Sequence, residues 1–349
     1  MTNNLFLQKK EMSKFEKLLI SEVKELTDDA VSISFDIDNK KKFNFKAGQY
    51  LTVKQIINGE EVRRAYSICS SNNKLEIGVR RVDGGKMSSF LTTVKKGDVL
   101  EVNPPNGNFI LTKNKNIVGI CAGSGITPIL SMIKSKLKEE SSFFTLIYGN
   151  KTKSSTMFYD ELKELEELYA SNFKIHWIFS QEKYDNCLEG RINKDNLETL
   201  SLNFKNSADY YICGPGEFID NAENFLRFND VKRSSIYFER FTSKSKKINT
   251  ENTKDIISNV TVIIDEEEFN FKLSSKAESL LDASVNIGAD VPFACKGGVC
   301  CTCKAKVIEG EAKMSENFSL SEEEVKEGYI LACQSHPVSE NLIVDFDEI

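Results

Sequence analysis

The chain has 349 residues, of which 40% are hydrophobic and 28% are charged. This composition excludes a disordered or low-complexity protein, and the length predicts two or three domains. The net charge of −6 is unevenly distributed, because residues 258–349 carry 18 acidic and 7 basic side chains (net −11), against 34 and 39 before them (net +5). The acidic segment argues against nucleic-acid binding, since it would repel phosphates. The excess of acidic residues is compatible with docking to a basic protein surface, or with an acidic surface that only keeps the segment soluble.

No segment of the sequence is typical of secretion or membrane insertion. The first residues, MTNNLFLQKKEM, lack an apolar run followed by a small-residue cleavage site. The longest mostly apolar stretch, residues 117–130, is interrupted by glycines and hydroxyl residues and is too short to span a bilayer. We therefore expect a cytoplasmic protein without membrane insertion, in which clustered cysteines stay reduced and serve metal binding or catalysis.

Residues 14–112 are predicted to form a β-rich domain. Runs of alternating or β-branched residues are separated by turn signals, and this spacing predicts a small barrel or sandwich. The runs occupy residues 18–23, 31–37, 50–53 and 75–79. A further strand is expected to begin at Arg64.

Residues 113–241 follow a different pattern, in which short apolar strands alternate with helical segments. This alternation predicts a parallel, doubly wound α/β sheet. The expected strands are residues 117–121, 143–148, 173–179, 210–213 and 236–241, and a charged helix is expected at 159–170.

Residues 242–257 are mostly polar without apolar periodicity until their end, which is typical of a linker. The remaining residues, 258–349, are predicted to form a third compact domain. Strands are expected at 260–264 and 269–273, followed by a helix near 277–286.

Five of the nine cysteines fall within 39 residues of this third domain. Four of them have the spacing C-x4-C-x2-C with a fourth cysteine 30 positions later, which is the spacing of plant-type [2Fe–2S] ferredoxins. These expected ligands are Cys295, Cys300, Cys303 and Cys333. The alternative is a structural zinc site, but such sites usually have two C-x2-C pairs and only one is present. Cys301 is expected to point away from the cluster.

Short motifs also occur at ordered positions in the first two domains. The β-rich domain contains Arg64-Ala65-Tyr66-Ser67 and then a G-x-x-S-x-x-L segment that begins at Gly85. The second domain contains a Gly-Ser-Gly turn between a strand and a helix, with Pro128 where the dinucleotide fingerprint has its third glycine. A Cys-Gly-Pro motif ends a later strand at residues 213–215, and Phe238-Glu239-Arg240-Phe241 comes last.

Taken in this order, the motifs resemble the ferredoxin-NADP reductase superfamily, and the cysteine loop resembles plant-type ferredoxin domains. The resemblance covers residues 14–349 and looks most like the single-chain reductases of multicomponent oxygenases, in particular phenylacetyl-CoA epoxidase reductase subunits. It implies an FAD-binding antiparallel β-barrel, a doubly wound α/β nucleotide-binding domain and a C-terminal β-grasp ferredoxin domain.

The resemblance also implies roles for individual residues. An arginine can pair with the FAD pyrophosphate, a tyrosine can stack on the flavin ring, and backbone N–H groups at a helix start can bind phosphate. The expected FAD-binding residues are Arg64, Tyr66, Ser67, Gly85, Lys86, Met87, Ser88 and Ser89. The expected nucleotide-binding residues are Gly123, Ser124, Gly125, Thr127, Asn150, Ser180, Cys213, Gly214 and Pro215. The expected catalytic residues are Ser67, Cys213 and Glu239. Phe218 replaces the family's usual methionine, so the geometry of that contact is left open.

The preference between NADH and NADPH depends on the loops after the second and third strands of the nucleotide domain. Lys151 and Lys153 follow the second strand without an acidic residue, which favours a 2′-phosphate. Gln181 stands where NADP-preferring relatives often have an arginine. We expect NADPH, with NADH as the alternative.

The resulting hypothesis is a reductase that passes electrons from NAD(P)H through FAD and a [2Fe–2S] cluster to a partner oxygenase. A related reductase could instead serve a hybrid-cluster protein, a steroid hydroxylase or a fatty-acid desaturase. The sequence is also compatible with a non-catalytic, zinc-binding interaction module and with a ferredoxin-like sensor attached to a vestigial reductase.

Overall fold

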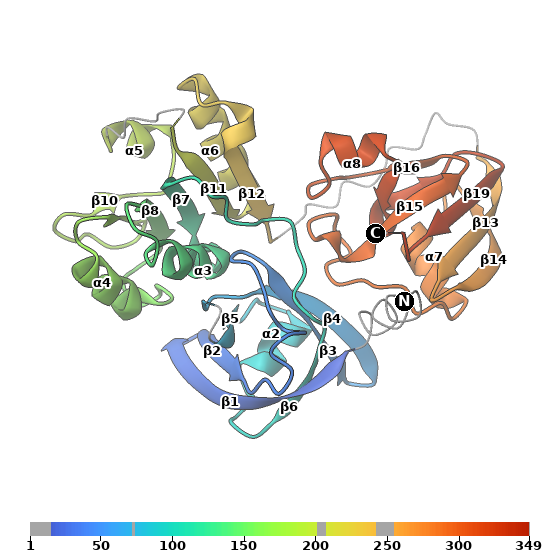
Figure 1. Cartoon of the computed structure of the whole chain (residues 1–349), viewed down its shortest axis with the longest axis horizontal. Helices are drawn as coiled ribbons and strands as arrows, with labels where there is room; N and C mark the ends of the chain where they lie inside the picture. The colour runs from blue at the N-terminus through green and yellow to red at the C-terminus, as the bar shows by residue number, and fades with distance from the viewer. Residues whose placement is uncertain (1–14, 72–73, 201–206, 242–254, 349) are drawn as a thin grey trace. The chain divides into compact units, whose positions relative to one another are not determined.

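The computed structural model describes residues 15–71, 74–200, 207–241 and 255–348 (Figure 1). Residues 15–241 form one compact unit, and the described residues from 255 onward belong to a second. The predicted linker at 242–257 lies outside the described residues except for its last three. The predicted three-domain boundaries remain predictions. Within the described residues, no helix has both the length and the apolar character needed to cross a bilayer.

The first half of the larger unit is a six-stranded antiparallel sheet in the order β4-β3-β6-β1-β2-β5. Its elements are β1 (Glu16–Thr27), β2 (Ala30–Phe35), β3 (Tyr50–Ile57), β4 (Glu60–Ser67), β5 (Leu75–Arg80), α2 (Lys86–Leu91) and β6 (Val99–Val102). Aliphatic side chains such as Ile33, Leu51 and Ile77 fill the interior and are completely buried. The β-rich fold predicted from the alternating runs, and the antiparallel arrangement that the family resemblance implies, are therefore confirmed.

The strand that carries the arginine motif begins earlier than predicted. β4 starts at Glu60, directly after a tight turn in which Asn58 and Gly59 both have positive φ, so Arg64 lies inside the strand. The two exposed glutamates at the start of β4 hide the strand in the sequence, because they interrupt its apolar alternation.

The second half of the larger unit is an all-parallel sheet in the order β10-β9-β8-β7-β11-β12. Its strands are β7 (Asn116–Ala122), β8 (Phe143–Asn150), β9 (Phe173–Phe179), β10 (Leu188–Glu189), β11 (Asp209–Gly214) and β12 (Ile236–Arg240). Its helices are η1 (Gly123–Gly125), α3 (Ile126–Lys136), α4 (Tyr159–Leu168), α5 (Lys194–Thr199), α6 (Gly216–Phe228) and η2 (Arg233–Ser235).

The strand order of this parallel sheet indicates where a ligand would bind. The chain runs outward from β7 through β8, β9 and β10 and then returns to β11 on the other side of β7. In doubly wound sheets, ligands bind beyond the carboxyl ends of the strands at such a reversal. The carboxyl ends of β7 and β11 carry the Gly-Ser-Gly turn and the Cys-Gly-Pro motif.

The smaller unit contains a five-stranded sheet in the order β14-β13-β19-β15-β17 and a two-stranded ribbon, β16-β18. Its strands are β13 (Ile257–Ile264), β14 (Glu267–Ser274), β15 (Lys304–Glu309), β16 (Ala312–Met314), β17 (Tyr329–Leu331), β18 (Ser335–Pro337) and β19 (Asn341–Asp345). Its helices are α7 (Leu280–Asn286), η3 (Cys301–Cys303), α8 (Glu322–Lys326) and η4 (Ala332–Gln334). The helix predicted near 277–286 begins at Leu280, because the Ser279 side chain caps it by accepting a hydrogen bond from Asp282 N.

Candidate functional site

The Gly-Ser-Gly turn and the Cys-Gly-Pro motif are in direct contact at the carboxyl ends of the neighbouring strands β7 and β11. A Cβ atom on Gly125 would lie only 2.1 Å from the carbonyl oxygen of Cys213, so a side chain at this position cannot be accommodated without movement. Gly123 has φ of +55°, a conformation that favours glycine. Gly125 is therefore required for the close approach of the turn to β11, and Gly123 favours the conformation of the turn itself.

The turn is also held by hydrogen bonds to its carbonyl groups. The buried Tyr148 on β8 donates its hydroxyl to the Gly123 oxygen at 2.9 Å. Thr127, in the first turn of α3, donates to the Ser124 oxygen at 3.1 Å. The start of α3 is thus fixed in an orientation in which its first N–H groups can bind a phosphate.

Asn150 and Ser180 lie at the carboxyl ends of β8 and β9. The backbone N–H of Ser180 donates to the Asn150 carbonyl at 3.0 Å, which brings the two residues together. The Asn150 side-chain nitrogen is buried and lacks a hydrogen-bond partner among the described residues. A buried donor of this kind fits a polar ligand group, because leaving it unpaired is unfavourable.

Phe218 occupies the position of the missing methionine, and its contact is now defined. Gly214 has φ of +157°, and a Cβ there would lie 2.9 Å from a ring carbon of Phe218. The aromatic ring therefore packs directly over Gly214 from the first turn of α6, and it remains partly exposed.

The three expected catalytic residues come together although they lie far apart in the sequence. Cys213 on β11 and Glu239 on β12 are direct neighbours in the sheet register. The Ser67 hydroxyl, at the end of β4, donates to Glu239 Oε2 at 3.3 Å. Burial raises the pKa of Glu239 to about 8, and the hydrogen bond from Ser67 opposes that shift only in part. Burial likewise raises the pKa of the Cys213 thiol well above its usual value.

Arg64 and Tyr66 lie on β4 just before Ser67. The Arg64 side chain is exposed, with Nη1 donating to the Arg63 carbonyl at 2.7 Å, so most of its donors face solvent. Tyr66 is partly buried, and burial raises its pKa. Because the Arg64 guanidinium is exposed, it can pair with an anion. Because the Tyr66 ring is only partly buried, another ring can stack on it.

The residues from Gly85 to Ser89 form the start of α2, and their side chains have different environments. The Ser88 hydroxyl accepts a hydrogen bond from Val82 N at 3.1 Å and so closes the turn before the helix. Met87 is buried in the core of the β-domain. Lys86 forms an ion pair with Glu60 at the start of β4. The side chains of Met87 and Ser88 are therefore occupied. The N–H groups of Gly85 and Ser89 already donate to the carbonyls of Val82 and Gly85, so the N–H groups that the helix start offers to a ligand are those of Lys86, Met87 and Ser88.

Arg80, at the end of β5, is a site residue that no sequence motif marks. Its guanidinium donates to the carbonyl of Ser155, in the loop after β8, and forms an ion pair with Asp29 at 3.3 Å. Its Nη1 lies 3.3 Å from the position of a Cβ on Gly123. The β-domain thus places a cation beside the glycine turn of the nucleotide domain. The sequence gives no signal for this arginine, because its neighbours come from remote parts of the chain.

The four expected ligand cysteines converge in the smaller unit, where all are free thiols. The Cys300 and Cys295 sulfurs are 3.1 Å apart. Cys333 lies within hydrogen-bonding reach of Cys295 and Cys303, and these bonds raise its pKa. Hydrogen bonds from Cys300 and Cys333 lower the pKa of Cys295 well below its usual value. Within the described ranges, no group of three His, Cys, Asp or Glu side chains could hold a single metal ion.

Cys301 is the fifth cysteine of this region and has a different environment. Its thiol donates to the Ser319 carbonyl at 3.4 Å, and burial raises its pKa to about 11. The backbone N–H of Gly297 instead points at the Cys295 sulfur at 3.3 Å. The loop therefore directs the Gly297 N–H group toward one of the four expected ligand sulfurs, that of Cys295.

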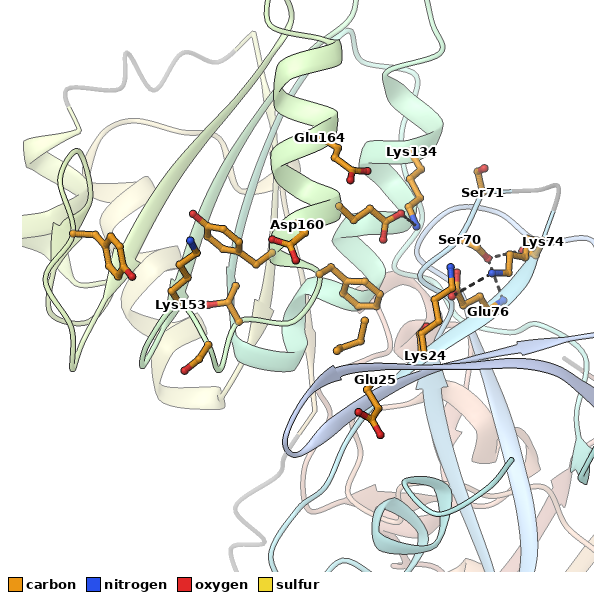
Figure 2. Close-up of a pocket in the computed structure, with 18 of the residues that line it drawn as sticks. Lys24, Glu25, Ser70, Ser71, Lys74, Glu76, Lys134, Lys153, Asp160 and Glu164 are labelled. Atoms are coloured by element: carbon orange, nitrogen blue, oxygen red, sulfur yellow. Dashed lines mark hydrogen bonds and ion pairs between the residues drawn. The ribbon is translucent and has the colours of Figure 1, made fainter. Parts of the chain in front are cut away.

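A separate cavity of about 770 Å³ lies between β1, the loop before β5 and α4 (Figure 2). Figure 2 shows Lys24 on one side of it and Asp160 on the other. Four lysines and six carboxylates line it, and some are paired, such as Lys134 with Glu161 at 2.6 Å. The excess of carboxylates would repel a phosphate, and none of the expected site residues lines this cavity.

Three segments of the chain match known protein families. Residues 17–110 match the oxidoreductase FAD-binding domain, residues 120–224 the oxidoreductase NAD-binding domain, and residues 262–338 the 2Fe-2S iron-sulfur cluster binding domain. The chain is 38% identical to a subunit of the 1,2-phenylacetyl-CoA epoxidase of Escherichia coli K12, with 96% of this chain and 99% of that protein aligned. It is 31% identical to the ferredoxin reductase component of 3-ketosteroid-9-alpha-monooxygenase from Rhodococcus rhodochrous, over 94% and 96% of the two chains.

Among solved structures, phthalate dioxygenase reductase matches with a TM-score of 0.62 and 25% identity, covering 97% of this chain and 99% of that one. These matches confirm the expected fold classes and the cofactors FAD, a nicotinamide nucleotide and a [2Fe–2S] cluster. The chain belongs to the family of oxygenase reductases that carry electrons from NAD(P)H through FAD and a [2Fe–2S] cluster to a partner oxygenase.

Proposed function

We propose that Ser67, Cys213 and Glu239 form the site at which the nicotinamide and the flavin ring meet. The contact of Ser67 with Glu239, which are 172 positions apart, carries this proposal, because it joins the end of the flavin motif to the last strand of the nucleotide domain. With a pKa of about 8, the Glu239 carboxyl holds a proton at neutral pH and adds no negative charge beside the ring.

FAD, when bound, accepts a hydride and supplies single electrons to the iron–sulfur cluster. The surrounding residues would bind and orient it. Arg64 would pair with its pyrophosphate, Tyr66 would stack on its ring, and within the segment from Gly85 to Ser89 the N–H groups of Lys86, Met87 and Ser88 would bind phosphate. The exposed guanidinium of Arg64 supports a contact made by its side chain. The side chains of Met87 and Ser88 are occupied, which supports contacts made by the backbone at the helix start.

The nucleotide is proposed to bind across the crevice between β7 and β11. Gly123, Ser124, Gly125 and Thr127 present the start of α3 to its pyrophosphate, and Arg80 adds a positive charge from the β-domain. Asn150 and Ser180 contact the ribose side, supported by the unpaired Asn150 amide nitrogen. Gly214, covered by the Phe218 ring, and the exposed Pro215 follow the buried Cys213 at the end of β11.

The coenzyme is proposed to be NADPH. Glu182, two residues after Ser180, accepts a hydrogen bond from Lys153 N at 2.7 Å and is therefore engaged with the loop after β8. Lys151 is exposed at the end of β8 and is available for a 2′-phosphate. A Lys151→Ala variant should lose affinity for NADPH while its affinity for NADH is unchanged.

The four cysteines Cys295, Cys300, Cys303 and Cys333 are proposed to hold the [2Fe–2S] cluster. Their thiols form a connected set, in which Cys295 contacts Cys300 and Cys333, and Cys333 also contacts Cys303. The spacing of these four cysteines is that of plant-type [2Fe–2S] domains and lacks the second C-x2-C pair that structural zinc sites usually have. Purified protein should therefore show flavin and iron–sulfur absorption together, and NADPH should bleach both. A colourless protein that contains zinc would contradict the proposal.

The acceptor is proposed to be a cytoplasmic oxygenase of the phenylacetyl-CoA epoxidase type, because the 38% identity extends over nearly the whole length of both chains. A steroid hydroxylase is the second candidate, favoured by the 31% identity to the ketosteroid monooxygenase component. Capture of the native partner from cell extract, followed by electron transfer to it, distinguishes the two.

A further inference from the structure

The loop that carries three of the cysteines contains an unusual backbone conformation. Lys296, directly after Cys295, has φ of +53°, although it bears a side chain. Residues other than glycine adopt this left-handed conformation only at an energetic cost, so the surrounding structure must hold it in place. The exposed Lys296 side chain pairs with Asp282 at 2.8 Å and lies over the Phe293 ring, and neither contact fixes its backbone. The restraint therefore has to act on the backbone itself.

The restraint on that backbone comes from Gln334, the residue after Cys333. Its side-chain Nε2 donates to the Lys296 carbonyl at 3.1 Å and to the Cys333 carbonyl at the same distance. The backbone carbonyl of Gln334 accepts a hydrogen bond from Ser315 N at 2.8 Å, which fixes the residue to the neighbouring ribbon. One amide group therefore connects the three-cysteine loop to the segment that carries the fourth cysteine.

The Gln334 side chain also lies close to Gly298, which is further along the same loop. Gly298 has φ of +71°, and a Cβ there would lie 3.1 Å from Gln334 Cγ. Once the Lys296 carbonyl is turned toward Gln334, the next N–H, that of Gly297, is directed at the Cys295 sulfur at 3.3 Å. Hydrogen bonds to ligand sulfurs and the partners behind them set the potential and retention of an iron–sulfur cluster.

We propose that Gln334 is a positioning residue for the iron–sulfur cluster, which acts by holding Lys296 in the left-handed conformation that aims the Gly297 N–H at Cys295. The inference rests on the proposed ligands Cys295 and Cys333. Gln334 uses its donor group in this role, so a side chain of equal length without a donor removes the function and preserves the packing.

The test is Gln334→Met in the full-length protein loaded with FAD and cluster. Chelator-driven loss of the visible absorption should be about tenfold faster than in the parent protein. The midpoint potential of the cluster should become more negative, because the sulfur of Cys295 loses an aligned donor. Asn259→Leu is the matched control, since it removes an amide hydrogen bond to Asn341, at 3.1 Å, in the sheet of the same unit. It should change neither quantity.

A second substitution tests the route through Lys296. Glycine adopts positive φ without strain, so in a Lys296→Gly background the effect of Gln334→Met should be much smaller. The inference would be overturned if Gln334→Met had the same effect in both backgrounds. It would also be overturned if the cluster of the Gln334→Met protein had the parent's loss rate and midpoint potential. If Gln334→Met retains too little cluster to measure, Gln334→Asn replaces it with the same criteria. A parent protein without a [2Fe–2S] spectrum would instead refute the proposed ligands themselves.

Discussion

The two units build their sites in opposite ways. In residues 15–241 the site is assembled from remote segments, since Ser67 meets Glu239 and Arg80 meets Ser155 across 172 and 75 positions. In the smaller unit three proposed ligands fall within nine consecutive residues, and one short segment supplies the fourth. A local site can be recognised from spacing alone, whereas a dispersed site depends on the whole fold. Substitutions should therefore act on the two sites independently.

Cys303→Ser should produce the largest effect and sharpen this contrast. Loss of a proposed cluster ligand should abolish cytochrome c reduction, while dye reduction at the flavin continues at the parent rate. Cys301→Ser is the control, because this thiol donates to the Ser319 carbonyl. Both rates are measured with NADPH on the same preparations, and an equal loss of both activities in Cys303→Ser would contradict the proposed electron path.

Gly125→Ala should have the next largest effect, confined to the larger unit. The added methyl group would meet the Cys213 carbonyl at 2.1 Å, and such overpacking costs about 1–3 kcal/mol. The backbone at Gly125 has φ of −61°, so the cost is purely one of space. NADPH titrations should show at least about tenfold weaker binding with an unchanged cluster spectrum.

Gly97→Ala provides the control for that experiment. Its φ is +95° and a Cβ there has open space around it, so only backbone strain is added. It should lower the unfolding temperature slightly and leave NADPH affinity unchanged. Loss of cluster absorption in Gly125→Ala would break the proposed independence of the two units.

The difference between the units also explains how much can be predicted from sequence. The buried strands are predictable because their residues are apolar in a regular pattern, as for β9, whose predicted range agrees with the observed one. The cysteine loop is predictable from its spacing. The start of β4 is predicted too late, because its first residues, Glu60 and Glu61, are exposed and polar.

The remaining parts cannot be predicted because they depend on contacts between remote residues. Arg80 lies in an ordinary strand sequence, and only the tertiary structure brings it beside Gly123. Gln334 follows a recognisable cysteine, but its bond to Lys296 crosses 38 positions. The occupied hydroxyl of Ser88 likewise follows from the turn at Val82 rather than from its motif.

The pH dependence of stability gives a third test, again specific to the larger unit. The pKa of the Glu239 carboxyl is about 8 in the folded protein, and its unshifted value is 4.5. Between these values the unfolded state has already released the proton that the folded state keeps, so stability falls as pH rises through this window. Glu239→Gln removes this loss, and its advantage over the parent should grow toward an upper bound of about 5 kcal/mol at pH 9.

Denaturant unfolding of the larger unit, followed by flavin fluorescence at pH 5, 7 and 9, measures that advantage. Glu217→Gln is the control, because Glu217 is an exposed residue in the first turn of α6. It should leave the pH dependence unchanged. A constant difference between Glu239→Gln and the parent across the range would show that Glu239 is already ionised at neutral pH.

Tyr148→Phe should produce the smallest effect and probes how firmly the glycine turn is held. The substitution keeps the buried ring but removes the hydroxyl that donates to the Gly123 carbonyl at 2.9 Å. A hydrogen bond of this kind contributes about 1 kcal/mol, so NADPH binding should weaken about fivefold, with the maximum rate little changed. Tyr184→Phe is the control, because Tyr184 is 46% exposed on the loop after β9 and lies outside the glycine turn. If the Tyr148→Phe protein binds NADPH as tightly as the parent does, the hydrogen bond is not needed to position the turn. The close packing of Gly125 against Cys213 would then be sufficient to hold the turn in place.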